Sequence, residues 1–399
     1  MNKLLSFFSF IIFSIKICLS QNNLWRVELA LNDHLNLPFF IEKSDDFHEG
    51  VFYIVNGKEK IPLIRKYSSA DSIYLAFREM DSYLVFKMDT SKNIRGYWKN
   101  NIKNQRIPLS GVHNDSIRFP ATNTSIPAKL SSKYKVSFST KDDPWPAVGL
   151  FHQNGQNLIG TFLTETGDFR FLSGNVYGNE LYLSCFDGSH AFLFTAKIDG
   201  EALLGRFYSG TSYRTDWEGK ADENAYLKSP NELTYIIDSA YNLNKIKVYK
   251  LSGLKSSLKL KNKPITIIQI MGSWCPNCLD ETNYFKTLYN KYSSKGLNIE
   301  SIGFEYGSSR RVQRKKLKQF VKKAQIPYPV YLGGKASKKI ASQLFPMLNE
   351  ISSFPTTLFV NKHGKIIHIH TGFNGPGTGT YYENYKKETE TIIESLFNE

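Results

Sequence analysis

The first half of the chain consists of short runs in which apolar and polar residues alternate. From Trp25 to about Leu227 these runs are rich in aromatic and β-branched residues, and glycine, asparagine and aspartate separate them. Alternation with a period of two is typical of strands that bury one face of a sheet. The pattern therefore predicts an all-β region that folds as a sandwich or as an antiparallel barrel.

This β-rich region contains a weak internal repeat. The matching pairs are residues 71–77 and 179–183, residues 96–98 and 205–207, and residues 25–29 and 134–138. A repeat of this kind indicates two similar sheets. The two sheets could pack as a sandwich or close into an antiparallel barrel. Closure would remove the unpaired edges, so we favour a barrel over a sandwich.

The pattern changes after residue 230. Residues 264–271 form a mostly apolar run, as expected for a strand that is buried on both faces. The other expected elements are helices at 275–291, 312–323, 336–345 and 382–397, and strands at 297–304, 327–332, 356–360 and 365–370. This order predicts a mixed α/β sheet covered on both faces. We therefore expect a β-rich domain over residues 21–230 and an α/β domain over residues 231–399.

The N-terminus has the pattern of a secretory signal peptide. Lys3 precedes an apolar stretch at residues 4–15, which is shorter than the roughly 20 residues of a membrane-spanning helix. Cleavage before Gln21 would remove residues 1–20. A lipid-anchored Cys18 is the alternative, although Ile17 is not the small residue expected before such a cysteine. We expect an exported protein with no integral membrane segment after signal removal.

The chain is basic, with a net charge of +15 over 399 residues. Such a charge could favour binding to nucleic acid or to an anionic membrane surface. The densest basic run, residues 310–323, interleaves apolar residues at helical spacing, which favours a solvated helix face. Because an exported protein has little access to nucleic acid, we expect no nucleic-acid partner.

Two closely spaced cysteines carry the chemistry. The sequence Trp274-Cys275-Pro276-Asn277-Cys278 stands where the apolar strand ends and a helix is expected to begin. The spacing lets both sulfurs close one small ring, and a helix start favours the thiolate of its first cysteine. The thiolate is the nucleophile of disulfide exchange. The motif therefore predicts a redox-active disulfide with Cys275 as nucleophile and Cys278 as the resolving thiol.

Other sites are less favoured. A zinc site needs four ligands, and no second cysteine pair or paired histidines completes one.

Cys185 shares a strand face with Leu181 and Leu183, which indicates a buried, inert thiol. His368 and His370 point the same way on a strand but lack a third ligand, so we expect an ordinary exposed pair. Residues 372–379 are glycine-rich, and they could wall a substrate groove or form a simple turn. We expect no metal and no cofactor.

Residues from about 240 to 399 resemble thioredoxin-fold proteins of the TlpA/ResA type, which are exported bacterial thiol–disulfide oxidoreductases. The resemblance rests on the dithiol motif, on Phe354-Pro355-Thr356 and on Glu281, three residues after Cys278. It implies a cis peptide bond before Pro355, in a loop that faces the dithiol and binds substrate. The β-rich half looks like the partner domain of some such proteins of the Bacteroidetes type, for which no activity is established.

One position departs from the thioredoxin pattern. Gln269 stands where many thioredoxins have a buried aspartate that accepts the proton of the resolving thiol. A neutral amide cannot be a general base. Another carboxylate, Glu281 or Glu305, would then serve as a proton relay. A solvated loop glutamate is the alternative for Glu305.

The motif and the resemblance together imply a reductase of protein disulfides in the periplasm or cell envelope of a Gram-negative bacterium. The electrons would come from a membrane or periplasmic thiol donor. A thiol oxidase or a peroxide-reducing relative would use the same fold. The alternative from another class is a binding protein whose β domain carries the main role. No catalytic constellation stands out in the β-rich region, so we expect it to position the substrate without adding chemistry.

Overall fold

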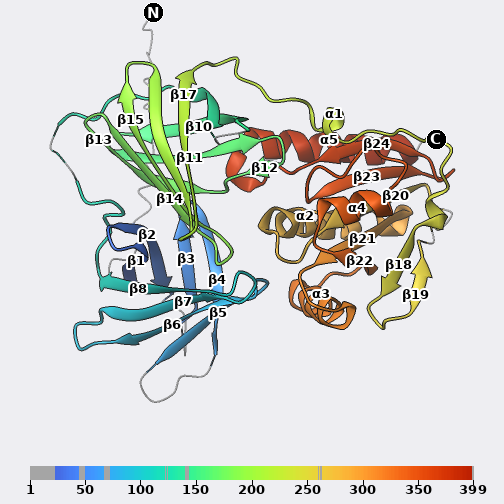
Figure 1. Ribbon diagram of the computed structural model, residues 1–399, viewed down its shortest axis with the longest axis horizontal. Helices are drawn as coiled ribbons and strands as arrows, with labels where there is room; N and C mark the ends of the chain where they lie inside the picture. The colour runs from blue at the N-terminus through green and yellow to red at the C-terminus, as the bar shows by residue number, and fades with distance from the viewer. Residues whose placement is uncertain are drawn as a thin grey trace, which may run out of the picture.

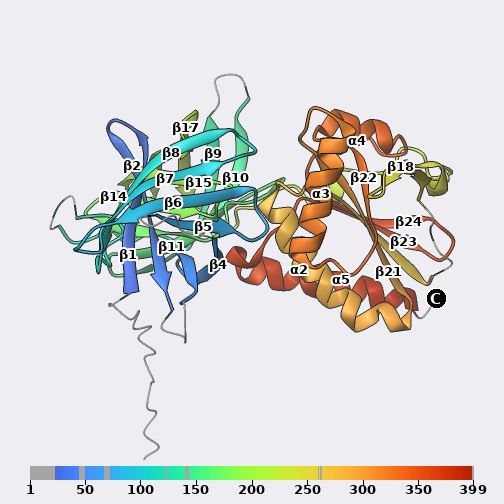
Figure 2. The ribbon, with the colours of Figure 1, turned by 90° about the horizontal axis from the view of Figure 1, so that it is seen from below.

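The computed structural model in Figure 1 describes residues 23–44, 50–66, 72–121, 123, 125–139, 143–258, 260 and 263–397. The predicted signal peptide, Cys18 included, lies outside the described residues. Two β barrels occupy the first part of the described chain, and an α/β domain lies beside them (Figure 1). Figure 2 shows the same side-by-side arrangement from below. Among the described residues, no helix is long and apolar enough to cross a bilayer.

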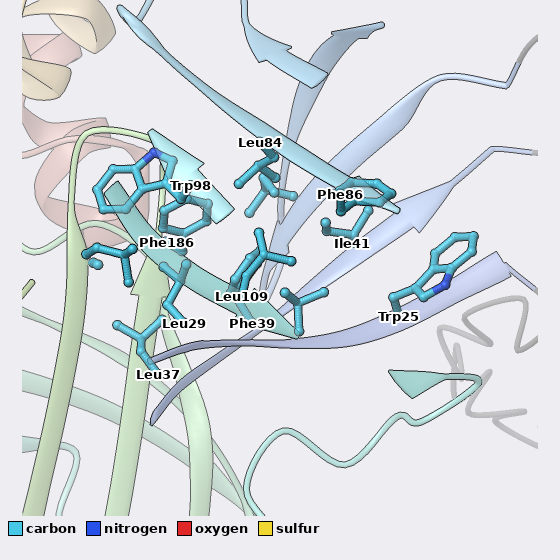
Figure 3. Close-up of a cluster of buried hydrophobic side chains, with 14 of the residues drawn as sticks. Trp25, Leu29, Leu37, Phe39, Ile41, Leu84, Phe86, Trp98, Leu109 and Phe186 are labelled. Carbon is cyan, nitrogen blue, oxygen red and sulfur yellow. The ribbon is translucent and has the colours of Figure 1, made fainter. Parts of the chain in front are cut away.

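The first barrel is a closed ring of antiparallel strands in which neighbours in sequence pair in turn. The ring closes where β1 (Leu24–Asn32) pairs with β8 (Gln105–His113). Between them lie β2 (Leu35–Lys43), β3 (Phe52–Asn56), β4 (Glu59–Lys66), β5 (Ile73–Phe77), β6 (Ser82–Met88) and β7 (Ile94–Asn100). Because alternate residues of each strand face inward, the interior fills with apolar side chains (Figure 3).

The second barrel closes in the same way, through the pairing of β9 (Lys133–Ser139) with β17 (Tyr213–Ala221). The two-residue strand β12 (Gly167–Asp168) is attached to β11 outside the ring. The other strands are β10 (Trp145–Asn154), β11 (Asn157–Thr164), β13 (Leu172–Tyr177), β14 (Glu180–Phe186), β15 (Ala191–Asp199) and β16 (Ala202–Ser209). The preference for a closed barrel over a sandwich is confirmed, but the two sheets close separately into two barrels rather than together into one.

The internal repeat corresponds to two copies of one barrel. Among the described strands, β1 and β9 each open a ring, β5 and β14 are each the fifth strand, and β7 and β16 are each the seventh. The three pairs of similar segments thus occupy equivalent places in the two rings. The predicted repeat is confirmed.

Side chains of the second barrel complete the hydrophobic core of the first barrel. Phe186, the last residue of β14 in the second barrel, is fully buried among side chains of the first barrel (Figure 3). Its ring centroid lies 4.5 Å from that of Phe39, 5.7 Å from that of Phe77 and 5.0 Å from that of Trp98. Aromatic pairs at these distances add packing energy to the burial of their area. This side chain therefore holds the barrels together.

The α/β domain contains a seven-stranded sheet in the order β19-β18-β22-β21-β20-β23-β24. Strands β20, β21 and β22 are parallel, and β23 and β24 extend the sheet in antiparallel fashion. Its strands are β18 (Lys247–Lys250), β19 (Lys255–Ser257), β20 (Ile265–Met271), β21 (Leu297–Glu305), β22 (Val330–Lys335), β23 (Thr356–Asn361) and β24 (Ile366–Thr371). Its helices are α2 (Pro276–Tyr292), α3 (Arg310–Ala324), α4 (Lys338–Leu344) and α5 (Thr380–Phe397), with the short α1 (Pro230–Leu233), η2 (Leu243–Lys245), η3 (Ser293–Lys295) and η4 (Pro376–Thr378).

Apolar side chains of β20 point to both faces of this sheet and contact the helices packed there. Ile265 and Ile267 lie in a cluster with α2 and α5, whereas Ile268 and Ile270 lie in a cluster with α4. The predicted mixed sheet and all its expected elements are found, with ends that differ by three residues or fewer. The hairpin of β18 and β19 was not predicted, because its strands are short and carry no clear apolar alternation.

Replacing Phe186 with alanine should destabilise the barrels by about 3–5 kcal/mol, because the cavity would open between two packed cores. Urea unfolding followed by tryptophan fluorescence measures the loss. Leu204→Ala is the control in the same barrel, since Leu204 is 58% exposed, and its effect should stay within about 0.5 kcal/mol. Equal effects of the two substitutions would contradict a role for Phe186 in joining the barrels.

Candidate active site

The dithiol lies at the junction between β20 and α2. Cys275 is the N-cap residue of α2, and its sulfur accepts a hydrogen bond from the backbone N–H of Cys278 at 3.2 Å. Cys275 is 7% exposed, whereas Cys278 is fully buried one turn further along the helix. The N–H groups at a helix start favour negative charge on the capping atom. The geometry therefore suits Cys275 as the sulfur that meets a substrate.

Burial changes the pKa of the second thiol of the motif, Cys278. Desolvation, and then the neighbouring Cys275 and Glu281, raise the pKa of the Cys278 thiol well above its usual range. A thiol in such surroundings stays protonated unless a base removes its proton. The two sulfurs of the motif thus have different environments.

The proline loop lies against the dithiol. The Phe354–Pro355 peptide bond is cis, which confirms the expectation drawn from the resemblance. The Cys275 thiol donates a hydrogen bond to the carbonyl oxygen of Phe354, with 3.5 Å between sulfur and oxygen. The hydroxyl of Thr356 is buried and donates to the carbonyl of Ser353, so this side chain is not available to a substrate.

Trp274 packs beside this loop. Its ring lies 5.8 Å from that of Phe354 and 5.0 Å from that of Tyr306, and its Nε1–H donates to the carbonyl of Phe304 at 2.9 Å. These contacts fix the residue that precedes Cys275. Asn277, on the other side of Cys275, donates a long hydrogen bond of 3.5 Å to the carbonyl of Phe373.

Gln269 holds a buried carboxyl group behind the dithiol. Its Nε2 donates to Glu281 at 2.9 Å, and the other Glu281 oxygen accepts hydrogen bonds from Thr357 at 2.8 Å and Tyr385 at 3.0 Å. Burial raises the pKa of Glu281 to about 7, and the hydrogen bonds only partly oppose this effect. The amide that cannot act as a base thus orients a carboxyl group that can.

Glu305 contacts the active-site loop rather than the sulfurs. Its two oxygens accept hydrogen bonds from the backbone N–H and the hydroxyl of Ser273, at 2.8 and 2.7 Å. It is 1% exposed, and burial raises its pKa to about 7 against the opposing charge of Lys316. The alternative of a solvated loop glutamate is therefore wrong.

Two further predictions have opposite outcomes. Cys185 is fully buried in the core of the second barrel beside Leu181 and Leu183, as expected. The prediction that His368 and His370 form an exposed pair is wrong. His370 is buried against Tyr385, with ring centroids 4.6 Å apart, and burial lowers its pKa to about 3. Within the described ranges, no group of three or more potential metal-binding side chains comes together.

The second barrel reaches the dithiol, which the sequence did not predict. A cavity of about 570 Å³ is lined by residues of both domains: Asp143, Trp145, Pro146, Thr164, Glu165, Thr166, Gly167, Asp168, Phe169, His190, Phe192, Trp274, Cys275, Pro276, Asn277 and Lys338. At its edge, the hydroxyl of Ser189 donates to the carbonyl of Trp274 at 3.4 Å. Gly167 has a φ of +149°, a backbone conformation that other residues rarely adopt, and it lies against the side chain of Asn277.

The glycine-rich segment 372–379 also contacts the second barrel. The backbone N–H of Gly375 donates to Asp168 at 2.6 Å, and a Cβ atom on Gly377 would lie 2.8 Å from the backbone of Arg170. A Cβ atom on Gly372 would approach the backbone of Thr166 equally closely, at 2.9 Å. The segment therefore supports domain packing next to the dithiol.

Arg170 joins all three parts of the molecule. Its guanidinium lies 2.6 Å from Glu59 of the first barrel, 3.4 Å from Asp187 of the second barrel and 2.6 Å from Asp280 of α2. The Arg170 side chain is 9% exposed. Burial raises the pKa of Asp280 to about 7 despite the opposing effect of Arg170. Because Asp280 follows Cys278 by two residues, the dithiol helix is tied to both barrels.

The dithiol lies within a segment that is similar to known proteins. Residues 247–386 match the family model described as Redoxin. ResA, a thiol-disulfide oxidoreductase of Bacillus cereus, is 30% identical over 121 residues, which cover 30% of this chain and 62% of ResA. The ResA of Bacillus subtilis (strain 168) is 26% identical over 132 residues, which cover 33% of this chain and 66% of that protein. The chain thus spans less than two thirds of the length of these relatives.

Solved structures show partial likenesses. A putative thiol:disulfide interchange protein DsbE from Chlorobium tepidum is 18% identical, with a TM-score of 0.31, and covers 40% of this chain and 98% of its own. StoA from Bacillus subtilis is 20% identical, with a TM-score of 0.26, and covers 39% of this chain and 96% of its own. The C-terminal part of the chain thus contains the Redoxin match, and it is similar in sequence to ResA proteins, as the motifs predict.

Glu305→Gln should flatten the dependence of stability on pH. Burial raises the pKa of this carboxyl from 4.5 to about 7, so the folded protein binds the proton more tightly than the unfolded chain. Its contribution to stability is fully present below about pH 4.5 and is lost as the pH rises through about 7. The difference between the two pKa values corresponds to about 3 kcal/mol.

Urea unfolding at about pH 5 and about pH 8 measures this effect. The wild type should lose about 3 kcal/mol more than Glu305→Gln between the two conditions. Glu350→Gln, at an exposed glutamate, should behave as the wild type. An unchanged pH dependence in Glu305→Gln would contradict the proposed burial effect.

Proposed function

We propose that this protein is an exported thiol–disulfide oxidoreductase that reduces protein disulfides. The observation that carries the proposal is the pairing of a helix-capping Cys275, at the edge of a cavity, with a fully buried Cys278. The resemblance to ResA proteins supports the same chemistry. The proposed organisation is a signal peptide at residues 1–20, a β-rich domain at 21–230 and a thioredoxin-like domain at 231–399.

In the proposed reaction, the thiolate of Cys275 attacks one sulfur of a substrate disulfide and forms a mixed disulfide. Cys278 then attacks the sulfur of Cys275, which closes the intramolecular disulfide and releases the reduced substrate. Pro276 restrains the ring between the two sulfurs, and Asn277 tunes its potential. Backbone groups near Phe354 and Pro355 would pair with an extended substrate segment.

The second step requires a base, because burial raises the pKa of Cys278. We assign this role to Glu281, whose own pKa is raised to about 7, close to the working pH. Glu305 would act through Ser273 by positioning the loop and relaying a proton. Electrons would reach the dithiol from a membrane or periplasmic thiol donor, since a reductase must be reduced again after each cycle.

The arrangement of the barrels favours this function over that of a binding protein. Buried side chains fill the interiors of both barrels. A cavity of about 570 Å³ lies between the second barrel and Cys275. The second barrel thus borders the space in which a substrate would meet the dithiol.

The first test of this function is the reduction of insulin by a small-molecule dithiol. The purified mature protein should accelerate this reaction, and Cys275→Ser should abolish the acceleration because the nucleophile is lost. Cys185→Ala is the matched control, since Cys185 is buried away from the dithiol in the second barrel core. Full activity in the double variant of Cys275 and Cys278 would refute the proposal.

The order of attack is tested by trapping. Cys278→Ser should accumulate mixed disulfides through Cys275, because the resolving thiol is absent, while Cys275→Ser should trap little. Non-reducing gels and mass spectrometry identify the linked cysteine. Trapping mainly through Cys278 would reverse the two roles.

A further inference from the structure

A histidine of the second barrel lines the same cavity as Cys275. His190 lies in the turn between β14 and β15, next to Ser189, whose hydroxyl contacts the carbonyl of Trp274. The turn therefore carries an imidazole to the side of the dithiol that a substrate would approach. Imidazole is the side chain whose ordinary proton exchange falls nearest neutral pH.

Asp187 fixes the orientation of this histidine. One carboxylate oxygen accepts a hydrogen bond from the backbone N–H of His190 at 2.6 Å, and the other lies 3.1 Å from the ring Nδ1. The His190 ring stacks on Phe192 with 4.5 Å between centroids. No hydrogen bond to Nε2 is found within the part of the chain that the structure describes. Nδ1 is thus held by the carboxylate, and Nε2 remains available for proton transfer.

The carboxylate is itself held in its ionised form. The Asp187 side chain is 2% exposed, and Arg170 lies 3.4 Å from it. Burial acts to raise the pKa of Asp187, but His190 and Arg170 together hold it below its usual range. An ionised, buried carboxylate stabilises the protonated imidazole that forms during proton transfer.

Cys275 lines this cavity. Its sulfur contacts the carbonyl oxygen of Phe354 and the backbone N–H of Cys278, and neither of these groups can take a proton from it. Glu281 is hydrogen-bonded behind the dithiol, and Glu305 is bonded to Ser273. Both carboxyl groups are buried, whereas His190 lines the cavity with Cys275.

We propose that His190, oriented by Asp187, is the acid–base group of the disulfide exchange at Cys275, and this proposal rests on the function proposed above. Nε2 accepts the proton of the Cys275 thiol. The thiolate attacks one substrate sulfur, the substrate S–S bond breaks, and a mixed disulfide with Cys275 forms. The departing thiolate takes the proton from His190.

The second half of the exchange completes the transfer of electrons and protons to the substrate. Cys278 attacks the sulfur of Cys275, the mixed disulfide breaks, and the proton of Cys278 passes to the second departing thiolate. Two electrons and two protons have then moved from the dithiol to the substrate. Under this proposal the β-rich region supplies a reacting group as well as a surface, which the sequence did not predict.

Other charged groups surround the imidazole. Those on its own turn, on the neighbouring barrel loops and on α4 are Asp187, Arg170, Asp143, Glu165, Asp168 and Lys338. Arg170 extends the set to Glu59 and Asp280. Replacing His190 alone leaves these charged groups in place. A comparison of the wild type with a His190 variant therefore isolates the contribution of the imidazole.

The test compares two disulfides whose leaving thiolates differ in basicity. Fully reduced, full-length protein is mixed with bis(2-hydroxyethyl) disulfide or with 5,5′-dithiobis(2-nitrobenzoic acid). The alkyl thiolate is strongly basic and benefits from a proton donor, whereas the aryl thiolate leaves without one. His190→Gln, which retains an N–H donor for Asp187, should lose about 10²-fold in rate with the alkyl disulfide. Its loss with the aryl disulfide should be at least about tenfold smaller.

Chemical rescue provides the second measurement. His190→Ala should regain rate with the alkyl disulfide when imidazole is added, because the cavity of about 570 Å³ has room for it. His152→Ala, at an exposed histidine of β10, should react as the wild type and gain nothing from imidazole. Circular dichroism checks that each variant is folded.

Wild-type rates in His190→Gln, or a folded His190→Ala that imidazole does not rescue, would each overturn the proposal. Equal losses with both disulfides would overturn the transfer of a proton from His190 to the departing thiolate. Cys275→Ser separates this failure from failure of the proposed function. If Cys275→Ser is inert toward both disulfides while His190→Gln is normal, the exchange at Cys275 stands and only the role of His190 is refuted. If Cys275→Ser reacts at the wild-type rate, the proposed function itself fails.

Discussion

The position of the dithiol depends on one buried guanidinium. Arg170 must neutralise its charge away from water, and it does so with carboxylates from both barrels and from α2. Removing one partner of a buried ion pair typically costs about 3–5 kcal/mol, because the remaining charge is left uncompensated. Asp280 belongs to the helix that carries Cys278, so the same interaction sets the distance between the active sulfurs and the second barrel.

The groups packed against Cys278 are shielded from water, and this burial determines the pKa values of the thiol and of its neighbouring carboxyl group. The β20 strand is buried along its whole length, and Gln269 lies at its centre with no exposed surface. In such surroundings the pKa of the Cys278 thiol and of Glu281 both rise, since burial penalises the charged form of each. A protonated thiol next to a carboxyl group that titrates near neutral pH is an arrangement suited to proton transfer. The surroundings of Cys275 differ from those of Cys278, because Cys275 and several polar groups line an open cavity.

The barrels explain how a large β region can serve a small redox domain. Buried side chains fill both rings, and residues of the second barrel complete the core of the first. Phe186 is one of them, and it ends the strand that leads into the turn with Asp187 and His190. This packing holds the turn next to Trp274. A rigid scaffold that presents a short loop to a reacting centre is a common division of labour in proteins.

The sequence by itself determined the features that depend on neighbours along the chain. The dithiol motif, the order of strands and helices after residue 264 and the repeat of the barrel all follow from local patterns of apolar residues, glycine and cysteine. The cis bond before Pro355 followed from resemblance. Tertiary structure decided the burial of Glu305 and His370 and the placement of His190 and Cys275 on one cavity. The reason is physical: the ion pair of Arg170 with Asp280 joins residues 110 positions apart, and no local pattern specifies which distant surfaces will exclude water together.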